Sequence, residues 1–244
     1  EKFAKDSEEI SPYQTKLLDD GHFLVRYLRA RDGHVAKAAT MMYSSLKWRD
    51  ANPPEDIESQ TMADDLKMGK MYMNGRDKEG RPIVIFRPSR DDDSLGTLES
   101  KVRFFVWVIE FSIARMAQGV TQMTWIIDMS SYHIGPSDLK RASLAKALLN
   151  TLQNEYPERV HRLLVVEPPW YFRVAFALIR PILSAKTLEK VLMEYRSKDS
   201  TDEKVVFPQL RELIKKTNLK SRSVELWLNR ILRISCGEKL HMML

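Results

Sequence analysis

YPERVHRLLVVEPPWYF, residues 156–172, is the stretch of sequence that decides the fold. The apolar run within it, residues 163–166, predicts a strand over residues 162–166 that is buried on both faces. Pro168 and Pro169 stop that strand, and an aromatic, apolar segment follows over residues 170–182. A surface helix of this composition makes physical sense as a gate over an apolar cavity.

Further strands and helices alternate on both sides of this stretch. The predicted strands cover residues 83–86, 123–129 and 205–207, and the predicted helices cover residues 98–118, 139–155 and 188–195. Gly119 is the expected stop of the first of these helices. Strands separated by helices of this length predict an α/β fold with a mixed, mostly parallel sheet.

The N-terminal part of the chain predicts helices only. Residues 23–28 place apolar side chains on one helical face, and residues 36–48 continue the pattern until Asn52-Pro53-Pro54 stops it. Residues 74–82 contain two glycines and predict a turn before the first strand. We therefore expect three parts: a helical domain over residues 1–67, an α/β domain over 68–208, and a basic amphipathic extension over 209–244.

The overall charge favours anionic partners. The 244 residues carry a net charge of +6 at pH 7, with a pI near 9.3. The basic residues are spread over many predicted helices without a recognisable nucleic-acid motif, so we expect no nucleic-acid partner. The single cysteine, Cys236, excludes an internal disulfide framework. No segment reaches the roughly 20 apolar residues that span a bilayer, and the charged first residues do not resemble a signal peptide.

Familiar catalytic and metal-binding patterns are absent from the sequence. It contains no G-x-G-x-x-G after a strand, no phosphate-binding loop, no H-E-x-x-H, no cysteine cluster and no G-x-S-x-G. Asp128 follows a buried strand without a partner nucleophile, so we interpret it as a strand-end cap. We expect no enzymatic activity, no metal and no cofactor.

Four blocks of sequence resemble the CRAL-TRIO family and, within it, the yeast-type phosphatidylinositol/phosphatidylcholine transfer proteins. These blocks are residues 23–31, 47–49, 77–82 and 156–190, in the order and spacing of the family. The resemblance implies an N-terminal helical subdomain beside a mixed sheet whose flanking helices enclose a large apolar pocket for one lipid. It also implies a gate helix that opens at a membrane and closes in water.

The resemblance places the gate at residues 171–183. Side chains there would cover the acyl chains, which cost about 0.8 kcal/mol for each methylene exposed to water. We expect gate and membrane contacts from Trp170, Tyr171, Phe172, Phe176, Ile179 and Leu183. We expect the pocket to be lined by Val84, Phe105, Ile109, Met123, Trp125 and Ile127.

The headgroup residues of the family's phosphatidylinositol-binding members have four counterparts here: Arg31, Glu158, Thr187 and Lys190. By this resemblance, Arg31 and Lys190 would neutralise the phosphodiester. Thr187 and Glu158 would form hydrogen bonds with inositol hydroxyls.

The sequence also departs from the family pattern. Asp32 stands where a basic residue often follows the counterpart of Arg31. Met123 and Trp125 stand where small hydroxyl residues hold phosphatidylcholine, and Ile109 replaces a tyrosine that serves the same headgroup. Because an unpaired choline phosphate costs several kcal/mol to bury, we expect weak phosphatidylcholine binding and a second, more apolar ligand.

The sequence therefore predicts a phosphatidylinositol-binding protein that transfers a phospholipid between membranes or presents it, for example to a lipid kinase. Its membrane contact would be transient, from the cytoplasm, at Golgi, endosomal or other internal membranes. Two alternatives remain open: a membrane-targeting or protein-interaction module of the same fold, and a carrier of a non-phospholipid ligand such as haem or a retinoid.

Overall fold

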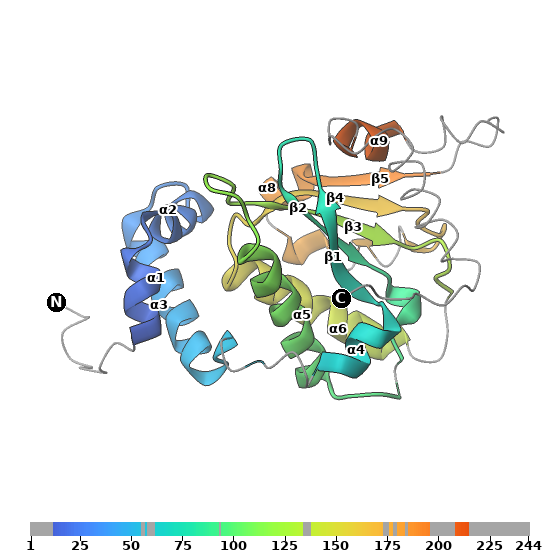
Figure 1. Cartoon of the computed structure of the whole chain (residues 1–244), viewed down its shortest axis with the longest axis horizontal. Helices are drawn as coiled ribbons and strands as arrows, with labels where there is room; N and C mark the ends of the chain where they lie inside the picture. Colours follow the sequence, from blue (N-terminus) through green and yellow to red (C-terminus); the bar gives the residue numbers. More distant parts are fainter. Residues whose placement is uncertain are drawn as a thin grey trace. The chain divides into compact units, whose positions relative to one another are not determined.

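The structure is a computed structural model that describes residues 12–54, 57, 62–92, 94–133, 138–172, 176–177, 180–183, 185–195 and 208–214 (Figure 1). The chain divides into two compact units. The N-terminal unit comprises residues 1–53 together with 152–158, and the sheet unit comprises residues 54–151 and 159–244. The three-part division expected from the sequence stays a prediction.

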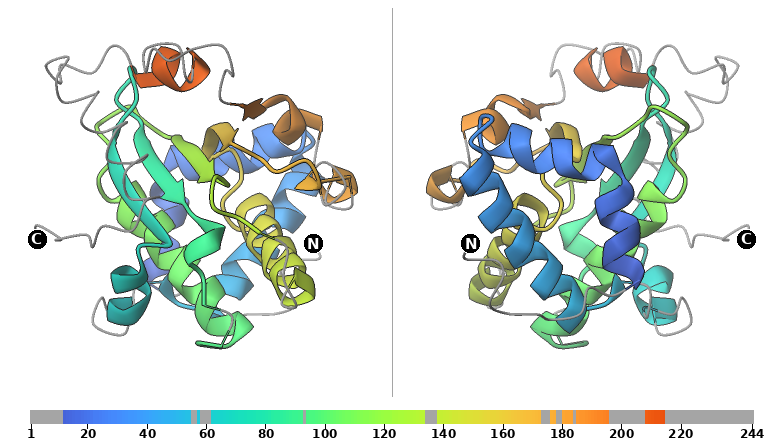
Figure 2. Two further views of the ribbon diagram at one scale, coloured as in Figure 1. Left: turned by 90° about the vertical axis from the view of Figure 1, so that its right-hand side faces the viewer. Right: turned by 90° about the vertical axis from the view of Figure 1, so that its left-hand side faces the viewer.

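The N-terminal unit is built from helices α1 (Pro12–Asp19), α2 (Gly21–Ala30) and α3 (Val35–Ala51), drawn in blue in Figure 2. Its core consists of Phe23, Tyr27, Ala38, Met41 and Leu46. Phe23 and Tyr27 are one helical turn apart, and their ring centroids lie 4.9 Å from each other. The predicted helical N-terminal region is confirmed.

Residues 152–158 belong to the N-terminal unit although they follow α3 by about a hundred residues. The Tyr27 hydroxyl lies 2.7 Å from Ser45 Oγ and 3.3 Å from the carbonyl oxygen of Glu155. The Arg49 guanidinium donates to the same carbonyl at 3.1 Å and lies over the Tyr156 ring, 4.6 Å from its centroid. The carbonyl oxygen of Glu155 is thus tied to both α2 and α3.

The sheet unit contains five strands in the order β1-β2-β3-β4-β5. They are β1 (Met71–Arg76), β2 (Pro82–Phe86), β3 (Met123–Asp128), β4 (Val160–Val166) and β5 (Val191–Glu194). β1 pairs with β2 in antiparallel orientation, and every later pair is parallel. The remaining elements of this part of the chain are α4 (Ala63–Met68), the 3₁₀ turns Pro88–Arg90 and Arg180–Ile182, α5 (Leu98–Ile113), α6 (Asp138–Asn154), α8 (Ala185–Glu189) and α9 (Pro208–Ile214).

The two faces of the sheet have different covers. On one face Ile83, Ile85, Ile126 and Leu164 form a core with Leu210 of α9. On the other face the ring of Phe105, from α5, lies 5.4 Å from that of Trp125 on β3. A sheet covered on both faces explains why the central strands are almost continuously apolar. The predicted fold class, a mixed and mostly parallel sheet flanked by helices with an N-terminal helical region, is confirmed.

Three local predictions are wrong. Residues 74–76, predicted as part of a turn, belong to β1, and the turn is confined to residues 77–81. α5 ends at Ile113 rather than at residue 118. Residues 191–194, predicted as helical, form β5. The strand predicted at residues 205–207 lies outside the described residues, as does most of the predicted C-terminal extension.

Candidate functional site

Residues 77–82, one of the four blocks of the resemblance, contain the β1–β2 turn and have a structural role. The buried carboxylate of Asp77 accepts hydrogen bonds from the backbone N–H groups of Glu79 and Arg81 at 3.0 and 2.9 Å. Its second oxygen accepts from the Thr124 hydroxyl at 2.8 Å and from the Arg81 guanidinium at 3.2 Å. Asp77 therefore closes the β1–β2 turn and ties it to β3.

Two cross-strand rows make up the sheet face that α5 contacts. In register across the five strands, one row is Met73, Val84, Trp125, Leu163 and Val191, except that Met73 lies beside the irregularity of β1. The next row, toward the carboxyl ends of the parallel strands, is Met71, Phe86, Ile127, Val165 and Met193. Residues in register share a face, so this surface is entirely apolar.

The six predicted pocket-lining residues differ in exposure. Val84, Phe105, Ile109, Met123 and Trp125 are 0–3% exposed and are packed against protein, whereas Ile127 is half-buried. Phe86 and Met193, in the same row as Ile127, are half-buried as well. The indole N–H of Trp125 is buried without a hydrogen-bond partner. The lining assignment of all six residues stays a prediction.

The predicted gate follows β4 directly. Trp170 is 81% exposed, and its ring centroid lies 5.7 Å from that of Tyr171 in an edge-on arrangement. The Tyr171 hydroxyl donates to the backbone carbonyl of Tyr132 at 2.8 Å. An exposed indole therefore sits beside a ring that is fixed to the loop after β3.

The rest of the gate is described in part. Phe172 and Phe176 stack with ring centroids 5.9 Å apart, and Leu183 is buried. The backbone N–H of Phe172 donates to the carbonyl of Pro169 at 2.9 Å, which begins a helical turn after the two prolines. Ile179 lies outside the described residues. That this segment is a gate stays a prediction.

The four predicted headgroup residues fall into two groups. Arg31 ends α2, and Glu158 follows α6; both belong to the N-terminal unit. Thr187 lies on α8, and the backbone N–H of Lys190 donates to its carbonyl at 3.1 Å, within the sheet unit. Glu158 has a φ of 58°, in the left-handed region that side-chain-bearing residues seldom adopt. The headgroup assignment of all four stays a prediction.

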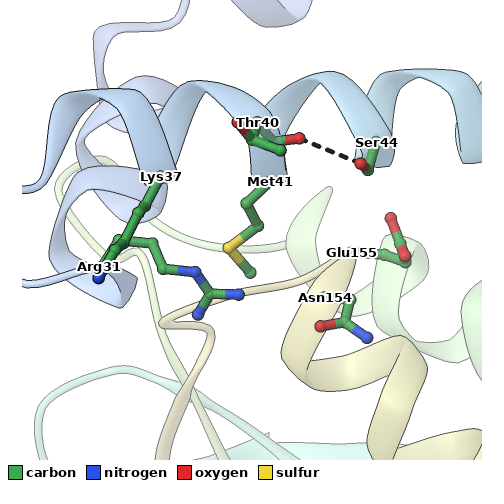
Figure 3. Close-up of a pocket in the computed structure, with 7 residues that line it drawn as sticks. All are labelled: Arg31, Lys37, Thr40, Met41, Ser44, Asn154 and Glu155. Carbon is green, nitrogen blue, oxygen red and sulfur yellow. Dashed lines mark hydrogen bonds between the residues drawn. The ribbon is translucent and has the colours of Figure 1, made fainter.

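A polar pocket of about 490 Å³ lies within the N-terminal unit (Figure 3). It is lined by Arg31, Lys37, Thr40, Met41, Ser44, Asn154 and Glu155. Of the predicted site residues, only Arg31 lines it. A signal for the others was present in the sequence, because residues 37, 40, 41 and 44 share one face of a helix that follows Arg31.

The Glu155 carboxylate is the least satisfied group of this pocket. Its Oε2 atom is buried and has no hydrogen-bond partner. Burial raises the pKa of this carboxyl, while the Ser45 hydroxyl and the Arg49 charge act in the opposite direction. A buried acceptor without a donor is costly, so this carboxylate lowers the stability of the N-terminal unit.

Asp128 is a strand-end cap, as the sequence predicts. One carboxylate oxygen accepts from the backbone N–H and the hydroxyl of Ser130 at 3.1 and 2.6 Å. The other accepts from the Arg87 guanidinium at 3.2 Å, and both charged side chains are buried.

Among the residues that the structure describes, no cluster of histidine, cysteine or acidic side chains is arranged to hold a metal ion. In the same residues, no helix combines the length and the apolar character that a membrane span requires.

Comparison with known proteins shows what this chain is similar to. Its sequence matches the CRAL/TRIO domain over residues 66–222 and the CRAL/TRIO N-terminal domain over residues 1–44. It is 31% identical over 215 residues to a CRAL-TRIO domain-containing protein of Schizosaccharomyces pombe, an alignment that covers 80% of this chain and 21% of that protein.

Two other relatives come from a plant and a mammal. Patellin-5 of Arabidopsis thaliana is 26% identical over 204 residues, covering 78% of this chain and 30% of the relative. Clavesin-1 of Rattus norvegicus is 26% identical over 184 residues, covering 72% and 51%. The chain thus spans between about a fifth and a half of the length of these relatives.

Among solved structures, Sfh5 has the same fold. The TM-score is 0.59 at 14% sequence identity, and the superposition covers 90% of this chain and 83% of Sfh5.

Proposed function

Because this chain belongs to the CRAL-TRIO family of lipid-binding domains, we propose that it is a carrier that binds phosphatidylinositol and exchanges it between membranes or presents it. The lipid enters an apolar cavity through a gate at residues 171–183, and the protein acts without chemical catalysis. Its membrane contact is peripheral and transient, on the cytoplasmic side of internal membranes, and a lipid kinase is the expected recipient of presented lipid.

The exposure of Trp170 is the observation that carries the proposal. A tryptophan that is 81% exposed is unusual on a protein surface, because burying this ring in an apolar medium is favourable. Tryptophan and tyrosine concentrate at the headgroup level of membranes, where an apolar ring and a polar N–H or O–H are both satisfied. Trp170 and Tyr171 supply this combination at one end of the gate.

The apolar rows of the sheet support a cavity behind the gate. Phe86, Ile127 and Met193 are half-buried in one row, at the carboxyl ends of the strands. In parallel sheets ligands bind outside these ends. Acyl chains laid against this row would lose their contact with water, at about 0.8 kcal/mol for each methylene. For a whole acyl chain to fit, movement of the gate would have to open further space beside Trp125.

The backbone of Glu158 supports a functional role for its side chain. A residue with a side chain at a φ of 58° costs roughly 1–2 kcal/mol relative to the right-handed region, and glycine removes that cost. Strain of this kind concentrates at functional positions. Glu158→Gly should therefore keep or raise the free energy of unfolding while lowering phosphatidylinositol transfer.

The gate is tested by transfer of fluorescent phosphatidylinositol between donor and acceptor vesicles. Phe172→Asp with Phe176→Asp should abolish transfer, because charged side chains cannot enter the acyl region of a membrane. The matched control places the same charges on two exposed leucines elsewhere, Leu95→Asp with Leu98→Asp, and should transfer normally. Normal transfer by the phenylalanine variant would refute the gate.

The headgroup residues are tested in the same assay. Glu158→Ala with Lys190→Ala should abolish phosphatidylinositol transfer without unfolding the protein. Glu99→Ala with Lys67→Ala makes the same change of charge at exposed positions and should have no effect.

Native mass spectrometry of the purified protein, followed by lipid extraction, distinguishes the carrier from the alternatives. One phosphatidylinositol per chain supports the carrier. An empty chain favours the interaction module, and another ligand favours a different cargo.

A further inference from the structure

Near the start of α6, residues 139–146 have the sequence LKRASLAK, in which two basic residues precede an exposed serine. Lys140 and Arg141 stand three and two positions before Ser143, and the apolar Leu144 follows it. Kinases select their substrates by complementary charge patterns, and a serine kinase with an acidic substrate groove selects basic residues just before the acceptor. Ser143 thus has the local sequence that such a kinase recognises.

This pattern distinguishes Ser143 from the other serines that the structure describes. The remaining exposed serines of those residues have no basic residue among the three that precede them; they are Ser44, Ser94, Ser130 and Ser131. The half-buried Ser89 follows Arg87, but that guanidinium is buried against Asp128 and is not accessible to a kinase. Within the described part of the chain, Ser143 is therefore the serine that such a kinase would select.

The N-terminal end of α6 is held weakly enough to meet a kinase. A substrate segment binds in extended form, so the residues around Ser143 must leave the helix for the reaction. None of the side chains of residues 141–147 is buried, and the first buried one after them is Leu148. Lys140 and Arg141 also stand in the first turn, where positive charges oppose the helix dipole. Local opening of this end therefore costs far less than unfolding of the sheet unit.

A series of contacts joins this end of α6 to the proposed gate. The Arg141 guanidinium lies over the Tyr132 ring, 5.3 Å from its centroid. The Tyr132 carbonyl accepts a hydrogen bond from the Tyr171 hydroxyl at 2.8 Å, and the exposed Trp170 ring lies beside that of Tyr171. All of these residues belong to the sheet unit. A charge on Ser143, two residues from Arg141, is thus added near the rings proposed to meet the membrane.

We propose that Ser143 is phosphorylated by a serine kinase that selects basic substrates, and that its phosphate weakens the contact of the gate with anionic membranes. The Ser143 Oγ atom forms a bond to the γ-phosphorus of ATP, and the bond from that phosphorus to the β-phosphate oxygen breaks. ADP leaves, and the hydroxyl proton passes to the catalytic aspartate of the kinase. The phosphorylation itself is independent of the proposed function, whereas its effect on membrane contact rests on that function.

The size of the effect follows from the charge that is added. Phosphoserine carries about two negative charges at pH 7. Near an anionic membrane one lysine or arginine contributes about fivefold in affinity, and an added negative charge opposes that attraction. One to two effective charges should therefore weaken binding to an anionic membrane about five- to thirtyfold.

The first arm of the test treats the whole, folded chain with ATP and the catalytic subunit of cAMP-dependent protein kinase, followed by peptide mass spectrometry. Ser143 should gain a phosphate, and position 143 of Ser143→Ala should gain none. Arg141→Gln should slow the reaction about tenfold or more, since it removes one of the two selected charges. The matched control Lys146→Gln removes a charge that follows the serine on the same helix and should leave the rate unchanged.

Two results of this arm would overturn the assignment. One is a folded chain that gains no phosphate. The other is phosphate on Ser223 or Ser235, which also follow basic residues and lie outside the described residues, with none on Ser143.

The second arm measures sedimentation with phosphatidylcholine vesicles that contain phosphatidylserine. The phosphorylated chain should bind them about five- to thirtyfold less tightly than the untreated chain, and kinase-treated Ser143→Ala should bind like the untreated chain. The difference should vanish in about 1 M salt, which screens the added charge. Equal binding by the phosphorylated and untreated chains would overturn the effect on the gate. A chain that is phosphorylated on Ser143 but transfers no phosphatidylinositol when untreated would refute the proposed function alone.

Discussion

Replacing Asp77 by alanine should destabilise the sheet unit strongly. The substitution removes the acceptor of four hydrogen bonds from a position that is 3% exposed. The Thr124 hydroxyl, which is fully buried, would lose this acceptor, whereas the backbone N–H groups of Glu79 and Arg81 can partly turn to water. Hydrogen bonds to a charged group contribute roughly 1.5–3 kcal/mol each, so after this compensation the expected loss is about 3–5 kcal/mol.

That loss is at least about a fifth of the roughly 5–15 kcal/mol by which folded proteins are stable. It is measured by urea unfolding followed by circular dichroism. Thr124→Val removes one of the four bonds and should cost about 1 kcal/mol. The double substitution should cost less than the sum, because both single changes remove the same bond. A loss below 1 kcal/mol for Asp77→Ala would refute the structural role assigned to this turn.

Three further outcomes are expected. Leu210→Ala should lower the free energy of unfolding by about 2–5 kcal/mol in urea titrations, because Leu210 is buried in the core between α9 and the sheet; a loss under 1 kcal/mol would contradict that packing. Burial raises the pKa of Glu194, so its contribution to stability is complete below pH 4.5 and is lost as the pH rises through the folded pKa; the stability of the unaltered protein relative to Glu194→Gln should fall over that window, and a constant difference from pH 4 to 8 would disprove it. Trp170→Ala should reduce vesicle binding without changing the melting temperature, and equal binding would exclude this ring from the membrane contact.

The sequence was sufficient for the central strands because their apolar runs are bounded by turn residues. It misled at β1, where Asn74-Gly75 looks like a turn. In the structure Gly75 has a φ of 71° and lies where the β1–β2 register shifts, between Met73 and Arg76. Such a bulge uses glycine inside a strand, and the local sequence does not distinguish it from a turn.

The other two wrong predictions have different causes. Residues 191–194 are a short apolar run that suits either a helix or a strand, and pairing with β4 selects the strand. The apolar pattern of α5 continues past Ile113, but the helix ends where the backbone N–H of Ala114 donates to the carbonyl of Glu110. Gly119 lies in the following loop with a φ of 81°. Helix ends of this kind depend on local capping that periodicity does not encode.

The candidate site was predictable where a motif carries it. Arg31 was found because it follows a recognisable triplet, and the structure places it in a pocket. Thr40 and Ser44 were missed because a hydroxyl on a helix face is ordinary until its partners are known. Glu155 was missed because residues 152–158 join α2 and α3 only in the folded chain.

Because residues 152–158 belong to the N-terminal unit, that unit cannot be completed until those residues have been synthesised. The helices of residues 12–53 leave the ribosome about a hundred residues before Glu155 and Tyr156, which tie them together. At roughly 5–20 residues per second, this delay is about 5–20 s. During that interval Tyr27 and Arg49 lack the carbonyl they later share, and the nascent helices depend on their own small core. A ribosome that stalls between these two points would therefore carry an N-terminal unit whose helices are all synthesised but whose contacts with Glu155 and Tyr156 have not yet formed.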